Sequence, residues 1–159
     1  MRKLLVLLIT VLALFLIPNK AYAIEKINPN AGFRYQLKRF QEKIILLTKI
    51  SPGAKADYYQ VLLNKRLAEL IYTVNNKDVA NIEKTSQRYE TTAGNLTELI
   101  TANGLVEKAK QAEILFSEHL KQIEAIKGVF EYDTGESRLV QNDINSLTIY
   151  FDLLKSVTN

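Results

Sequence analysis

One short motif in the chain could carry hydrolytic chemistry. Asp133-Thr134-Gly135 matches the triplet that supplies the catalytic carboxylate in aspartic peptidases. That chemistry needs two carboxylates that share one proton, contributed by two lobes or by a dimer. Here the triplet occurs once and lies between two predicted helices, where Asp-Thr-Gly is an ordinary turn and helix cap. We therefore expect no catalytic residue, and a hydrolase that uses the Asp133 loop remains the remote alternative.

The chain offers little for metal or thiol chemistry. His119 is the only histidine, and there is no cysteine. A metal site on a helix needs a second histidine four residues away or a Glu-x-x-His pair. The residues that share the helix face of His119 are Leu115, Phe116, Gln122 and Ile123. We expect His119 to be a half-exposed helix residue, and we expect no metal and no cofactor.

A basic edge on the first predicted helix is the candidate interaction surface. Lys38, Arg39 and Lys43 fall on one edge of that helix, and Tyr58 lies beside the apolar stripe of the next helix. This surface could contact anionic lipid or cell-wall polymer. The plainer alternative is a solvated face in which Glu42 is interleaved with the three cations.

Two predicted helices joined by Ser51-Pro52-Gly53 organise the chain, over residues 29–74. In the first helix, apolar residues recur at steps of four and three, which predicts one apolar face. They are Phe33, Leu37, Phe40, Ile44 and Leu47. Ile45 and Leu46 widen this stripe, so we expect the helix to be covered on more than one side. Because the connection is short, the two helices are predicted to be antiparallel neighbours.

Counting from that turn predicts an ion pair between the two helices. Pro52 lies ten residues after Glu42 and fourteen before Arg66, so the two side chains are about one helical turn out of level. Arg66 is flanked by Leu63, Leu67 and Leu70. Its stem should be partly buried, and its guanidinium then needs an anionic partner. We predict that Glu42 is that partner.

These residues resemble a known bacterial family, domain of unknown function 5667. The resemblance spans residues 29 to about 90. It rests on Pro29-Asn30, Phe33, Tyr35, Leu37-Lys38-Arg39, Glu42, Lys55-Ala56 and Arg66-Leu67-Ala68-Glu69. The family is extracytoplasmic and has no agreed activity. The resemblance therefore implies a helical fold and a compartment, and it implies no active site.

The N-terminus has the pattern of a secretory signal peptide. Met1-Arg2-Lys3 is followed by an apolar run from Leu4 to Ile17 and by Ala21-Tyr22-Ala23, which predicts cleavage before Ile24. The alternative is an uncleaved membrane anchor. Removing residues 1–23 takes away three of the 21 basic residues and none of the 17 acidic ones, which leaves 18 against 17. Such a balanced chain is not expected to bind nucleic acid.

The rest of the chain predicts three more amphipathic helices and no strand. Asn75 to Asp78, Asn103-Gly104 and residues 128–135 separate them. We therefore predict an all-α protein, a small antiparallel bundle of about five helices, as a single domain over residues 24–159. The short alternation from Val129 to Tyr132 has no second strand to pair with and is expected to be a helix end and loop.

These observations predict an extracytoplasmic, non-catalytic helical module with a binding or structural role. Its partner is unknown, with another envelope protein or a cell-wall polymer as candidates. Contact with a membrane is expected only through an uncleaved N-terminal segment. In that case the alternative is a membrane-anchored sensor or regulatory domain.

Overall fold

Five α-helices account for most of residues 32–158, which are the residues that the computed structural model describes. They are α2 (Gly32–Thr48), α3 (Pro52–Asn75), α4 (Val79–Ala102), α5 (Val106–Ile126) and α6 (Gly135–Thr158), with a 3₁₀ turn, η1 (Lys127–Val129), after α5. No strand occurs in this part of the chain, and the all-α prediction is confirmed. The predicted signal peptide and the segment that follows it lie outside the described residues.

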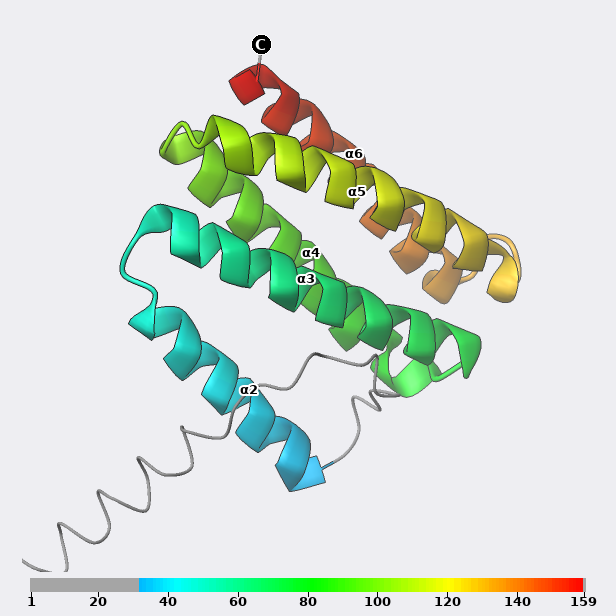
Figure 1. Ribbon diagram of the computed structural model, residues 1–159. Coiled ribbons are helices and arrows are strands. Elements are labelled where there is room, and N and C mark those ends of the chain that lie inside the picture. Colours follow the sequence, from blue (N-terminus) through cyan, green and yellow to red (C-terminus); the bar gives the residue numbers. More distant parts are fainter. Residues whose placement is uncertain (1–31, 159) are drawn as a thin grey trace, which may run out of the picture.

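Helices α3 to α6 form an antiparallel four-helix bundle (Figure 1). Helices α3 and α4 pack side by side as one antiparallel pair, and α5 and α6 pack as another. The two pairs meet through α4 on α6 and through α3 on α5, whereas α4 and α5, although consecutive, contact each other little. Figure 1 shows α2 on the side of the α3–α4 pair that lies away from α5 and α6.

Local sequence explains where the helices begin and turn. Ser51 caps α3, because its Oγ accepts a hydrogen bond from the backbone N–H of Ala54 at 3.2 Å, and Pro52 occupies the first turn. Gly104 has a φ of +58° in the turn between α4 and α5, a conformation that favours glycine. Thr134 precedes α6, and its Oγ1 accepts a hydrogen bond from the backbone N–H of Ser137 at 3.2 Å.

The hydrophobic core lies within α3 to α6. The predicted apolar stripes of these four helices supply it, and most of their members are buried. The larger buried members are Leu63, Leu67, Leu70, Val74, Ile82, Tyr89, Leu96, Ile100, Phe116, Ile123, Ile126, Val140, Ile144, Leu147 and Leu154. None of the residues of this core cluster comes from α2. The bundle therefore has a complete core without the first helix.

The predicted burial of the apolar stripe of α2 is wrong. Phe33, Phe40 and Leu47 are 79%, 60% and 81% exposed, Leu37 is also exposed, and Ile44 is half-buried. The opposite face of α2, which carries Tyr35 and Glu42, points at the bundle instead. Buried charges need partners, so the polar contacts of these two residues orient the helix and leave its apolar face outward.

Candidate functional site

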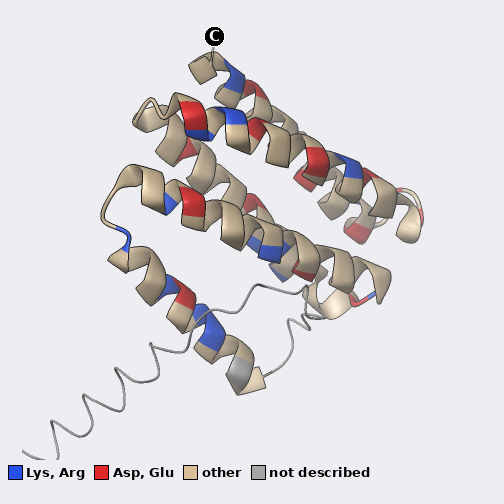
Figure 2. Ribbon diagram, viewed as in Figure 1, with Lys and Arg blue, Asp and Glu red and all other residues tan. Residues whose placement is uncertain are grey.

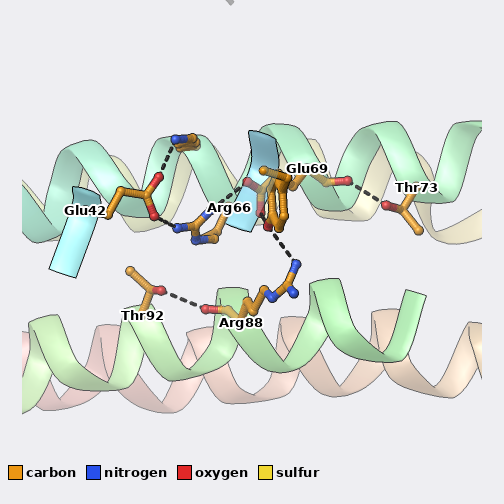
Figure 3. Close-up of polar contacts among 8 residues, drawn as sticks. Glu42, Arg66, Glu69, Thr73, Arg88 and Thr92 are labelled. Atoms are coloured by element: carbon orange, nitrogen blue, oxygen red, sulfur yellow. Dashed lines mark hydrogen bonds and ion pairs between the residues drawn. The ribbon is translucent and has the colours of Figure 1, made fainter. Parts of the chain in front are cut away.

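A polar network attaches α2 to the bundle (Figure 3). The structure brings Glu42 and Arg66 together: one carboxylate oxygen of Glu42 accepts from Arg66 Nη2 and the other accepts from Lys65 Nζ. Arg66 Nη1 in turn lies 2.5 Å from Glu69 Oε1. Arg66 is only 2% exposed, so its guanidinium sits between two carboxylates in a nearly water-free setting.

Tyr35 makes the second attachment of α2. Its hydroxyl donates to Glu69 Oε2 at 3.0 Å and accepts from Arg88 Nη1 of α4 at 2.6 Å. The guanidinium of Arg88 also lies 5.1 Å from the ring centroid of Tyr35, within cation–π range. Three helices thus meet at one neutral tyrosine. Positive and negative charges alternate along the rest of the network, from Lys65 through Glu42 and Arg66 to Glu69.

The network stabilises its own ionisation states. Burial lowers the pKa of Arg66, but Glu69 and Glu42 outweigh that effect and the pKa is raised overall. Burial, with the neighbouring Glu69 carboxylate, raises the pKa of Tyr35 to about 12. The tyrosine therefore remains a neutral hydrogen-bond donor at every physiological pH.

Sequence reasoning missed four members of this network: Lys65, Glu69, Tyr35 and Arg88. Glu69 follows Arg66 by three residues, a helical spacing at which opposite charges pair, and that signal was available. Tyr35 lies seven residues before Glu42, two helical turns along the same face of α2. Arg88 carries no comparable signal, because only the packing of α4 beside α3 brings it near.

A basic groove runs between α2 and α4. Two adjoining hollows of about 390 and 520 Å³ open there. The residues that line both are Arg39, Lys43, Lys84 and Arg88, and we call these four the basic groove. Within residues 32–158 none of the four forms an ion pair with a carboxylate.

Arg39 shows the electrostatic character of this groove. Burial lowers the pKa of Arg39, and the nearby positive charges of Arg66 and Arg88 lower it further, against the opposing effects of Tyr35 and Glu42. The lining itself is mainly cationic, because four basic side chains line both hollows and Glu42, in one of them, is the only carboxylate. An anion that entered the groove would meet cations that have no carboxylate partner among the described residues.

The predicted interaction surface is divided by the structure. Arg39 and Lys43 lie together in the basic groove. Tyr58 of α3 lies near the turn that joins α2 to α3, where Lys49 Nζ is 5.9 Å from its ring centroid. Lys38 is exposed on α2 but does not line either hollow.

The Asp133 loop has the geometry of a turn. Asp133 has a φ of +66°, and its exposed carboxylate accepts two hydrogen bonds from Arg138, at 3.0 Å from Nε and 2.8 Å from Nη2. Within the described part of the chain, no group of three histidine, aspartate or glutamate side chains is placed to hold a metal ion.

The prediction of a half-exposed His119 is wrong. The side chain is 1% exposed, with Nδ1 3.1 Å from the hydroxyl of Tyr89 and Nε2 3.0 Å from Asn64 Oδ1. Because an amide oxygen only accepts, Nε2 carries the proton and Nδ1 accepts from the tyrosine. The imidazole ring fills a polar position between α3, α4 and α5, which a single helix pattern does not reveal.

A second buried polar contact joins α4 to α6. Ser86 donates a hydrogen bond to Asp143 Oδ1 at 3.0 Å, whereas Asp143 Oδ2 has no partner in the structure. Burial raises the pKa of Asp143 to about 7, with the hydrogen bond from Ser86 opposing that shift and Glu90 adding to it. Folding therefore favours the protonated form of this carboxyl.

These features define a class of protein: an all-α four-helix bundle that carries an additional amphipathic helix, held by a buried polar network and facing outward with its apolar side. The family described as Domain of unknown function (DUF5667) matches residues 26–131, more than half of the chain, and the chain belongs to that family. The matched range ends at residue 131, whereas the resemblance noted in the sequence ended at about residue 90. Neither a curated protein nor a solved structure matches the chain.

Proposed function

We propose that this protein is an exported, non-catalytic binding module whose binding element is α2. The observation that carries the proposal is the orientation of that helix. Its polar face is buried in the network of Tyr35 and Glu42, while its apolar stripe faces solvent. A helix whose apolar side is left uncovered is typical of an interaction site.

The chemistry of α2 restricts its partner. Glu42 is the only acidic residue of the helix, and it points inward to Arg66 and Lys65. Figure 2 shows this single acidic segment among the basic segments of α2. The exposed side of α2 therefore combines an apolar stripe with a cationic border. The complementary partner offers an apolar surface edged with anionic groups.

The proposed export rests on the N-terminal sequence pattern, and the proposed non-catalytic role rests on the geometry of the Asp133 loop. The pattern of residues 1–23 supports export, and the N-terminal residue of the protein from its native cells, measured by mass spectrometry, is expected to be Ile24. No helix within residues 32–158 is long and apolar enough to cross a membrane. The ion pair of Asp133 with Arg138 on an exposed loop supports a turn rather than a hydrolytic centre.

Site-specific photo-crosslinking tests the binding role. A photoreactive phenylalanine analogue is placed at Phe40 and, as a matched control, at Ile114 of α5, which are 60% and 65% exposed. After irradiation of the cells that export the protein, we expect adducts from position 40 and none from position 114. Equal adducts at both positions, or none at position 40, would contradict the assignment of α2 as the binding element.

A further inference from the structure

The apolar stripe of α2 and the basic groove meet along one edge of the molecule. Phe40 belongs to the exposed stripe and also lines one of the two hollows of the groove. Lys43 follows Phe40 by three residues and precedes Leu47 by four, so it borders the stripe on the helix surface. The same edge therefore offers apolar side chains beside cations that form no ion pair with a described carboxylate.

We propose that this edge docks onto the surface of an anionic phospholipid membrane. In this arrangement the stripe of α2 enters the boundary between headgroups and acyl chains, and the basic groove receives lipid phosphates. Helices that lie in the membrane interface have this combination of an apolar face with flanking lysine and arginine. The proposal rests on the function proposed above and names the chemistry of the partner.

Charge complementarity favours a lipid surface over a second copy of this chain. Two copies that met through α2 would bring two basic grooves close together, and like charges at an interface oppose association. An anionic membrane offers the opposite charge along with an apolar layer. The cations of the groove come from both α2 and α4, so the bundle itself, and not α2 alone, presents them.

This proposal departs from the expectation that contact with a membrane requires an uncleaved N-terminal segment. Because the stripe is exposed, α2 itself can bind a membrane surface peripherally, whether or not the N-terminal segment is retained.

Tryptophan fluorescence tests the proposal cleanly, because the chain contains no tryptophan. The full chain is prepared as Phe40→Trp and, for comparison, as Ile114→Trp. With vesicles of mixed phosphatidylcholine and phosphatidylglycerol, we expect a blue shift at position 40 and none at position 114. The shift should weaken as salt is added, and it should be much smaller with phosphatidylcholine alone.

Charge reversal then tests the groove. In the Phe40→Trp background, Lys43→Glu with Lys84→Glu is expected to reduce vesicle affinity roughly tenfold or more. The control, Lys121→Glu with Lys127→Glu, makes the same change in net charge at exposed positions in α5 and η1 and should have little effect. Equal losses from the two pairs would overturn the role of the groove.

Other occupants give distinct results, and each overturns the lipid assignment. A blue shift at position 40 that grows with protein concentration in the absence of vesicles would indicate a second copy. Binding of soluble polyphosphate through Lys43 and Lys84, with no vesicle-induced shift, would indicate a soluble polyanion. Persistent crosslinks from position 40 in cells, without any vesicle-induced shift, would leave α2 as the binding element and reject only the membrane as its partner.

Discussion

The hydroxyl of Tyr35 in α2 donates a hydrogen bond to Glu69 in α3 and accepts one from Arg88 in α4. One side chain thereby links α2 to both α3 and α4, which pack closely on each other, whereas α2 itself makes few other contacts with the bundle. Two helical turns further along α2, Glu42 pairs with Arg66. The contacts of Tyr35 and Glu42 together determine which face of α2 turns inward. The outward apolar stripe follows from that choice, and so does the proposed binding role.

Arg66 should be the most sensitive residue of the network. Arg66→Ala leaves the carboxylate of Glu69 buried without its cation, so we expect a loss of about 3–5 kcal/mol in the free energy of unfolding. Glu42→Ala should lose less, about 1–2 kcal/mol, because Arg66 keeps Glu69 as a partner. Urea unfolding of both variants and of the double variant should show clearly non-additive losses.

An exposed pair provides the control for that series. Lys110 and Glu107 of α5 also form an ion pair, but both side chains are more than half exposed. Lys110→Ala is expected to lose less than about 1 kcal/mol. The account would be contradicted if Arg66→Ala were no more destabilising than Lys110→Ala, or if the Arg66 and Glu42 losses added simply.

Asp143 and His119 should give opposite dependences of stability on pH. Burial raises the pKa of Asp143 from 3.8 to about 7, so the folded state binds more protons than the unfolded state in that range, and stability falls as pH rises. Burial lowers the pKa of His119 from 6.5 to about 4, so there the unfolded state binds more protons, and stability rises with pH. Between about pH 4 and pH 6.5 the two effects oppose each other.

Single substitutions should separate the two effects. Between about pH 4 and pH 6.5, Asp143→Asn should change the slope of the unfolding free energy against pH by about +1.4 kcal/mol per pH unit relative to the wild type. His119→Gln should change that slope by about the same amount with the opposite sign. Above pH 7, Asp143→Asn should be the more stable protein, by at most about 4 kcal/mol. Urea unfolding of the wild type and both variants, measured from about pH 4 to pH 8, gives these slopes. Slope changes of the same sign in the two variants would contradict the opposite pH dependences of Asp143 and His119.

Gly94 lies where α4 approaches α6. A Cβ atom at this position would lie 3.1 Å from the Oη atom of Tyr150, which is too close without a small shift. Alanine is also the better helix former by about 1 kcal/mol. Gly94→Ala should therefore have little net effect alone and should stabilise the Tyr150→Phe protein by about 1 kcal/mol, as measured by urea unfolding. Equal effects in the two backgrounds would show that the contact with Tyr150 does not matter.

The fold was largely predictable because its determinants are local. Apolar residues at steps of three and four identify α3 to α6, and Ser51-Pro52-Gly53 identifies the turn between α2 and α3. Counting from that turn is enough to place Glu42 opposite Arg66. Glu69 was within reach of the same reasoning through its spacing from Arg66.

The orientation of α2 could not be predicted from its periodicity. An apolar stripe shows that one face of a helix avoids water, but it does not show which molecule covers that face. In α2 the side chains that bury are Tyr35 and Glu42, on the polar side, because their partners Arg66, Glu69 and Arg88 come from other helices. His119 escaped prediction for the same reason, since its partners lie on α3 and α4.

The accessibility of α2 tests the central claim most directly. Because the chain contains no cysteine, Phe40→Cys and Ile114→Cys each provide a single thiol on a face of similar exposure. In the purified protein a water-soluble maleimide should label both thiols at similar rates, and in native cell envelopes the thiol at position 40 alone should be protected. Slow labelling at position 40 in the purified protein would show that the stripe is packed inside, and equal labelling of both thiols in envelopes would show that α2 has no partner there.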